Sequence, residues 1–103
     1  MSVTCVDNRT YLSLVADDVL GTDNSDIVIA LDNNELVKQR WKIDDQLHKA
    51  RARSPISTLQ RIGRSEKLSL QYQTFGSDTT NTAEFDVKNV KQATEVVRKR
   101  CHW

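Results

Sequence analysis

Glycine is scarce in this chain of 103 residues, and its three copies at positions 21, 63 and 76 stand far apart. A phosphate-cradling loop or a dinucleotide-binding fingerprint needs several glycines close together, because only glycine lets the backbone approach a phosphate closely. The sequence therefore contains neither motif. His48 and His102 are distant from each other, and neither lies beside an acid-and-nucleophile motif. We expect no catalytic residues and a protein that is not an enzyme.

Cysteine is also rare, because Cys5 and Cys101 are the only two copies. There is no Cys-x-x-Cys or His-x-x-x-His spacing of the kind found in zinc sites, so we expect neither a metal nor a cofactor. The simplest interpretation is two reduced thiols in an intracellular protein. The alternative is a disulfide that ties the two ends of the chain together, which requires the two Cα atoms to lie within roughly 7 Å.

Long apolar runs are missing as well. No stretch approaches the ~20 apolar residues of a membrane helix, and residues 1–18 lack the basic and then apolar pattern of a secretory signal. An apolar content of 38% and a charged content of 28% are ordinary for a soluble globular protein. We expect one cytoplasmic domain over residues 1–103. It could be excised from a larger protein, because a terminal Trp103 must pack against something.

Apolar and polar residues alternate in several segments, and a period of two is typical of a strand with one buried face. The clearest examples are residues 68–73 and 83–87. The sequence predicts strands at residues 1–6, 10–16, 27–31, 36–43, 56–62, 67–73 and 82–86. For residues 44–53 it leaves open a short helix or an ordered loop, which the only proline, Pro55, would end. The 56–62 strand requires a bulge, because its three large apolar residues do not share one face.

The last segment of the chain has a helical pattern. Four residues form a stripe at helical spacing (Val90, Thr94, Val97 and Cys101). Asp86 is placed to cap the first turn, and basic residues 98–100 fill the last turn, where the helix dipole is negative. The predicted fold class is therefore α+β: an antiparallel β-sandwich or partly open barrel of about six to seven strands, closed by one C-terminal α-helix.

The net charge of +1 is unevenly distributed along the chain. Residues 1–36 hold seven acids and one arginine, whereas residues 37–67 hold nine basic residues and three acids. The basic stretch over residues 49–67 could bind anionic lipid headgroups, nucleic acid or an acidic peptide, with Lys49, Arg51 and Arg53 as the candidate residues. The alternative is a solvated charged surface. Aromatic residues are few, which argues against stacking on nucleic-acid bases.

Short antiparallel strands closed by one amphipathic helix resemble the pleckstrin-homology-like superfold, which includes pleckstrin-homology, phosphotyrosine-binding, GLUE and FERM third-lobe domains. The segments that carry the resemblance are Leu68-Ser69-Leu70, Ala83-Glu84-Phe85 and residues 87–103, which look like the last two strands and the capping helix. In phosphoinositide-binding members the first two strands are basic. Here that region is acidic, with Arg9 as its only basic residue, so the usual headgroup site has no matching residues.

The resemblance also implies a second use of the fold, in which a peptide adds as a strand to a groove between residues 56–62 and the closing helix. The candidate partner-binding residues are Ser57, Leu59, Arg61, Arg64, Val97, Arg100 and Trp103. The predicted function is a non-enzymatic scaffold or adaptor domain of a cytoplasmic or cytoskeletal protein, which binds a protein or peptide and can self-associate through its charge split. The alternatives are a peripheral membrane module that uses residues 49–67, and a small nucleic-acid-binding protein.

Overall fold

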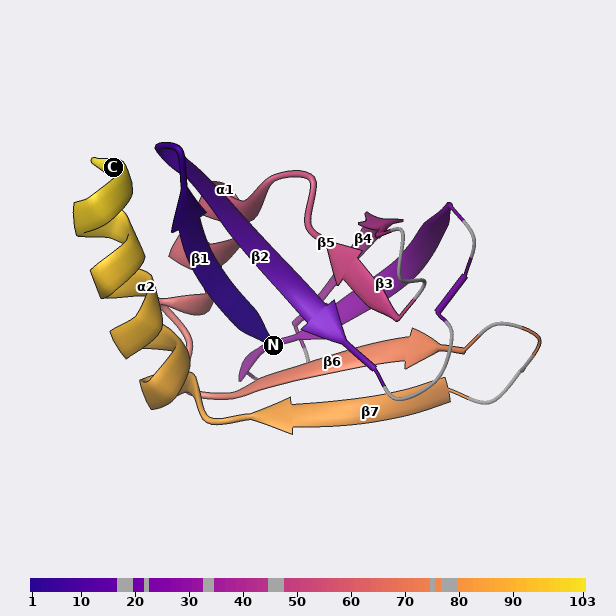
Figure 1. Cartoon of the computed structure of the whole chain (residues 1–103). Coiled ribbons are helices and arrows are strands. Elements are labelled where there is room, and N and C mark those ends of the chain that lie inside the picture. The colour runs from indigo at the N-terminus through magenta and orange to yellow at the C-terminus, as the bar shows by residue number, and fades with distance from the viewer. Residues whose placement is uncertain (17–19, 22, 33–34, 45–47, 75, 77–79) are drawn as a thin grey trace.

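The computed structural model in Figure 1 describes the chain except for residues 17–19, 22, 33–34, 45–47, 75 and 77–79. It contains one antiparallel sheet in the strand order β1-β2-β5-β4-β3-β6-β7, together with two helices. This confirms the predicted α+β class and the C-terminal helix. The elements are β1 (Ser2–Val6), β2 (Arg9–Val15), β3 (Asn24–Ala30), β4 (Leu36–Ile43), β5 (Lys49–Arg51), α1 (Pro55–Ile62), β6 (Leu68–Gln73), β7 (Thr80–Phe85) and α2 (Val87–Cys101).

The prediction of a strand over residues 56–62 is wrong, because this segment is helix α1. Pro55 occupies the start of the helix, where its fixed φ suits the helical conformation and its missing N–H costs no hydrogen bond. The buried residues Thr58 and Leu59 lie four and three positions before the buried Ile62, which places all three on one helical face. The spacing that would require a bulge in a strand is therefore regular in a helix.

The prediction of a helix or loop over residues 44–53 is also wrong for Lys49–Arg51, which forms the short strand β5. Ala50 is fully buried and pairs with Leu14 of β2 on one side and Ile43 of β4 on the other. Residues 45–47 lie outside the described part of the chain. Strand β5 pairs with β2 on one side and with β4 on the other. These three residues therefore join the β1–β2 hairpin and the β3–β4 hairpin into one continuous sheet.

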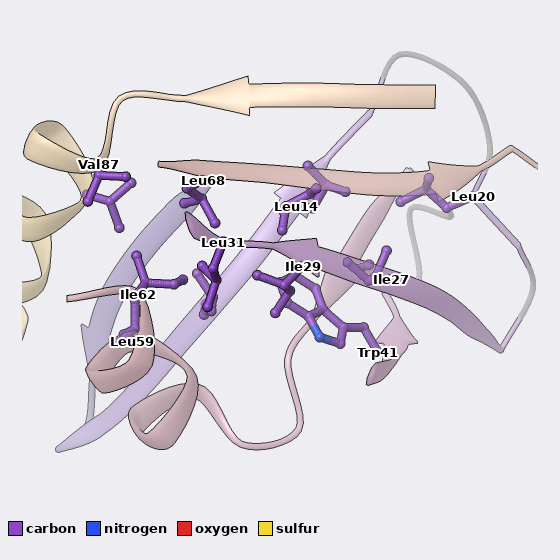
Figure 2. Packing of buried hydrophobic residues seen from close by; sticks show 14 of the residues in the cluster. Leu14, Leu20, Ile27, Ile29, Leu31, Trp41, Leu59, Ile62, Leu68 and Val87 are labelled. Atoms are coloured by element: carbon purple, nitrogen blue, oxygen red, sulfur yellow. The ribbon is translucent and has the colours of Figure 1, made fainter. Parts of the chain in front are cut away.

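The sheet is curved, and the core lies on its concave side. In Figure 1, strands β1 and β2 run at a steep angle to β6 and β7, and α2 lies at the end near β1. Both helices pack on this concave side: α1 contacts β2, and α2 contacts β1 and β2. Figure 2 shows the core side chains between these elements, with Leu14, Ile29 and Leu68 facing the same interior. The convex side carries the alternate residues of each strand.

A disulfide between Cys5 and Cys101 links β1 to the last residue of α2, with the two Cα atoms 5.9 Å apart. The prediction of two reduced thiols is therefore wrong, and the alternative of a terminal disulfide is correct. The physical reason is topological. Strand β1 is an edge of the sheet, and α2 returns along it at the end of the chain, so residues 96 positions apart become neighbours.

The two helices differ in how they begin, and this difference gives a testable prediction. The carboxylate of Asp86 accepts a hydrogen bond from the Lys88 N–H at 2.9 Å, whereas the Ser54 side chain makes no capping bond. We expect Asp86→Ala to lower the free energy of unfolding by about 1 kcal/mol, because it leaves an N–H of α2 without its partner. Ser54→Ala is the matched control and should change it by only a few tenths of a kcal/mol. Equal effects in urea denaturation would contradict this account of the two caps.

Candidate functional site

The described surface contains a groove that runs along α1 between the β1–β2 turn and α2. It consists of two hollows of about 700 Å³ and 320 Å³, which share Gln60 and Trp103. We call the two hollows together the helix groove. The larger hollow is lined by Asp7, Asn8, Arg9, Thr10, Ser54, Pro55, Ile56, Ser57, Gln60, Cys101 and Trp103. The smaller hollow is lined by Leu59, Gln60, Ile62, Gly63, Val90, Lys91, Thr94, Glu95, Arg98 and Trp103.

Trp103 is held in the helix groove by hydrogen bonds at both its backbone and its ring. His102 ends α2 in the left-handed conformation with φ of 61°, and this turns the chain back toward the helix. The Trp103 N–H donates to the Arg98 carbonyl at 3.0 Å, and the indole Nε1–H donates to Thr10 Oγ1 at 2.8 Å. The ring is half-buried and contributes to both hollows. The end of the chain is therefore a fixed part of the groove wall.

The groove has an apolar floor and a polar rim. Leu59 and Ile62 of α1 are each 1% exposed and form part of the floor, whereas Ile56 is 37% exposed at the opening. On the rim, Arg98 donates hydrogen bonds to both carboxylate oxygens of Glu95, at 3.1 and 2.6 Å. These bonds hold the pKa of Glu95 below its ordinary value.

Three of the seven predicted partner-binding residues line the groove, namely Ser57, Leu59 and Trp103. The other four, Arg61, Arg64, Val97 and Arg100, do not line either hollow. Arg61 pairs with Glu35 at 3.0 Å, and Val97 is buried against the sheet. Because the wall of the groove is a helix, it offers no backbone ladder, so the strand-addition mode expected at residues 56–62 is wrong.

Sequence reasoning missed several exposed groove residues, among them Ile56, Gln60 and Arg98. Ile56 and Gln60 lie one helical turn apart on α1, and a strand interpretation cannot bring them together. The available signal was Pro55 at the start of a segment with apolar residues every third position. Arg98 was interpreted only as a charge in the last turn of α2.

The predicted anion-binding residues Lys49, Arg51 and Arg53 lie away from the groove. Lys49 and Arg51 belong to β5 on the convex side of the sheet, and Arg51 lies directly opposite Lys42 of β4. The Arg51 guanidinium lies over the Tyr11 ring at 5.7 Å from its centroid. Arg53 donates hydrogen bonds to the Arg40 carbonyl and to Asn24 Oδ1. The structure therefore groups these three residues with the basic residues of β4.

Several of the acids in residues 1–36 form contacts within the fold. Asp26 pairs with Arg40 at 3.2 Å across β3 and β4, and Glu35 pairs with Arg61. Asp32 accepts hydrogen bonds from the backbone N–H groups of residues 66 and 67. Asp17 and Asp18 lie outside the described residues. Acids of the N-terminal third thus pair with basic residues from later in the chain, which partly neutralises the uneven charge distribution.

Two further observations bear on the chemistry of the chain. Among the described residues, no group of three or more His, Cys, Asp or Glu side chains lies close enough together to hold a metal ion. No helix in the described part of the chain is long and apolar enough to cross a membrane.

Comparisons with known proteins give one positive result. The model of the family described as type VI secretion system VasI, EvfG matches residues 1–103, which is the whole chain. No curated protein and no solved structure is similar enough to count as a match.

Proposed function

The chain belongs to the type VI secretion system VasI family, and we propose that it is a non-enzymatic component that docks another protein of that secretion system in the helix groove. The observation that carries this proposal is the position of Trp103, which is fixed by hydrogen bonds between two adjoining hollows. Tryptophan is enriched among the residues that contribute most to binding energy in protein interfaces. Because the Trp103 side chain is already held in place, less of its conformational entropy would be lost when a partner binds.

The lining of the groove favours an extended segment of the partner with an apolar side chain next to an acidic one. The apolar side chain would contact Leu59 and the Trp103 ring, which are part of the smaller hollow. Arg9 and Lys91 are exposed on opposite parts of the rim, and neither forms an ion pair with a described residue. They would attract a carboxylate, and so set the orientation of the segment.

We also propose that the domain works in an oxidising compartment rather than in the cytoplasm. The Cys5–Cys101 disulfide supports this location, because disulfides persist outside the reducing cytosol and are rare within it. The resemblance to pleckstrin-homology-like domains stays a prediction. A fold of that type would be compatible with a role in protein binding. The match to a type VI secretion family supports such a role more directly.

Substitution of one groove residue tests the proposed function. Ile56→Asp places a charge at the mouth of the larger hollow, and the helix tolerates it because an acid in the first turn is favourable. Val96→Asp is the matched control, because Val96 is 64% exposed on α2 and lines neither hollow. We expect Ile56→Asp to reduce secretion by the type VI system at least tenfold, corresponding to about 1.4 kcal/mol of lost binding. Val96→Asp should leave secretion within about twofold of the wild type.

A photo-crosslinking amino acid at position 60 provides a second measurement in cells. Gln60 lines both hollows, so a groove-bound partner should give one crosslinked product, identified by mass spectrometry as a component of the secretion system. The same amino acid at position 96 should give no such product. Equal loss of secretion in the two aspartate variants, or crosslinking only at position 96, would overturn the groove proposal.

A further inference from the structure

The convex side of the sheet carries a group of basic side chains that the groove does not use. We call it the basic face, and it consists of Lys38, Arg40, Lys42, Lys49, Arg51 and Arg53. Strand β4 alternates these exposed cations with inward residues such as Trp41 and Ile43. Lys42 and Arg51 are direct cross-strand partners, so two like charges face each other. Such a pair destabilises a sheet, and its presence therefore favours a role in binding over a role in folding.

Within the described part of the chain, one ion pair involves the basic face. Arg40 pairs with Asp26 at 3.2 Å, and it is the only member of the basic face with an ion pair among the described residues. Arg53 is oriented by hydrogen bonds to a backbone carbonyl and to Asn24. The remaining cations project from adjacent antiparallel strands on one side of the sheet. The result is a concentration of positive charge in a molecule whose net charge is only +1.

The basic face has the form of a broad surface. Its members line neither hollow of the helix groove. Alternate residues on a strand are about 6.6 Å apart, so the five cations on β4 and β5 are spread over two strands instead of converging on one point. Such spacing suits many separate negative groups in a plane better than one small anion.

An apolar residue and an aromatic residue adjoin these cations. Val15 of β2 is 60% exposed and is the direct cross-strand partner of Lys49. The Tyr11 ring lies under the Arg51 guanidinium on the same side of the sheet. This combination of side chains suits the interface of a lipid bilayer. The cations can contact the anionic headgroups, and the apolar and aromatic side chains can enter the boundary of the acyl chains.

We propose that the basic face docks on a membrane surface that contains anionic phospholipids. Nucleic acid fits less well, because the face offers one half-buried aromatic ring for stacking and the disulfide favours a compartment that is not the cytosol. Docking by the convex side would leave both helices, which lie on the concave side, pointing away from the bilayer. The helix groove would then stay open to a partner while the domain is bound to the membrane. This inference does not depend on the groove proposal.

Vesicle co-sedimentation of the disulfide-bonded protein tests the inference. The probes are vesicles of phosphatidylcholine alone and vesicles with roughly 30% phosphatidylglycerol. We expect binding only to the anionic vesicles, and a decrease of at least tenfold when sodium chloride is raised from about 50 to about 300 mM. The variant Lys38→Gln/Lys42→Gln/Arg51→Gln should lower the partition coefficient at least tenfold.

A matched variant separates the position of the charges from their number. Lys88→Gln/Lys99→Gln/Arg100→Gln also removes three cations, but from α2 on the other side of the molecule. It should lower the partition coefficient less than threefold. Equal losses in the two variants would show a net-charge effect and overturn the inference, as would failure of the wild type to bind anionic vesicles at low salt. In the second case an acidic protein surface would become the better candidate for the basic face. Loss of secretion in Ile56→Asp with unchanged vesicle binding would support both proposals separately.

Discussion

Loss of the Cys5–Cys101 disulfide is expected to lower the free energy of unfolding by about 3–5 kcal/mol. The crosslink joins residues 96 positions apart, so it constrains nearly the whole unfolded chain. Loop-closure entropy grows with loop length, and a loop of this size is near the upper end of what a single disulfide provides. For a domain of this size such a loss should lower the melting temperature by roughly 15–30 °C.

The structure also indicates which part of the protein should unfold first without the disulfide. Only four residues of α2 are buried (Val87, Val90, Val97 and Cys101). Beyond Val90 the helix buries only Val97 and Cys101, and Cys101 is covalently held to Cys5 of β1. Without the bond, the last turn of α2 should fray and Trp103 should lose its hydrogen bond to Thr10. Hydrogen exchange should then be faster for the amides of residues 98–103 than for those of β3 and β4.

The experiment compares the wild type with Cys5→Ala/Cys101→Ala in urea denaturation, each with and without a reducing agent. The wild type should lose stability on reduction to about the level of the variant. The variant itself should not respond to the reducing agent, which controls for other effects of the reagent. A variant that unfolds within about 1 kcal/mol of the oxidised wild type would contradict the predicted role of the crosslink.

The strands with strict alternation were predictable from the sequence. In β6 and β7 each apolar residue sits two positions from the next, and in β4 Val37, Trp41 and Ile43 point inward while the cations point outward. The stripe and cap of α2 were equally clear. These elements share one property, namely that their burial repeats over at least five residues. Local patterns of that length are sufficient to distinguish a strand from a helix.

Helix α1, strand β5 and the disulfide depend on relations that a local pattern does not contain. A proline can end one segment or begin the next. The prediction that Pro55 ends a segment was wrong, because it begins α1. This helix has only eight residues, which is too short for its periodicity to be clear in the sequence. Strand β5 has three residues and is recognisable only from its partners on β2 and β4. The two cysteines become neighbours only because an edge strand and the last helix pack together.

The candidate sites follow the same division. Leu59 and Trp103 were predicted as groove residues from the resemblance, which implies a groove between residues 56–62 and the closing helix, whereas Gln60 required the knowledge that residues 55–62 are helical. The charge count identified Lys49 and Arg51, but the register between β4 and β5 was needed to add Lys42. A sequence thus shows which residues carry charge or apolar surface, and the topology determines which of them meet.

Truncation of Trp41 to alanine is expected to destabilise the protein by about 3–5 kcal/mol, which is comparable to loss of the disulfide. Trp41 is fully buried and is among the largest side chains of the core, and Figure 2 shows it beside Ile29 and Ile27. Alanine would leave a cavity in the core that surrounding side chains can fill only in part. The variant should unfold at a much lower urea concentration than the wild type.

The indole also supports the groove through a chain of hydrogen bonds. Its Nε1–H donates to Gln39 Oε1 at 2.9 Å, and Gln39 Nε2–H donates to Thr58 Oγ1 at 3.2 Å. The Thr58 hydroxyl in turn donates to the Ser54 carbonyl at 2.8 Å, at the start of α1. Trp41 therefore helps to orient the helix that forms one wall of the groove. Its substitution should affect the groove even in molecules that remain folded.

Trp41→Phe separates the two contributions, because phenylalanine fills much of the space and cannot donate the hydrogen bond. We expect it to cost about 1–3 kcal/mol, since Gln39 is left with a half-buried acceptor that has lost its donor. Gln39→Leu in the Trp41→Phe background should recover part of that loss, because it removes the unpaired group. Equal destabilisation by Trp41→Phe and Trp41→Ala would mean that the hydrogen bond dominates over the cavity. No recovery with Gln39→Leu would mean that the connection between Trp41 and α1 is not energetically important, and that the groove wall is positioned by the apolar contacts of Leu59 and Ile62 alone.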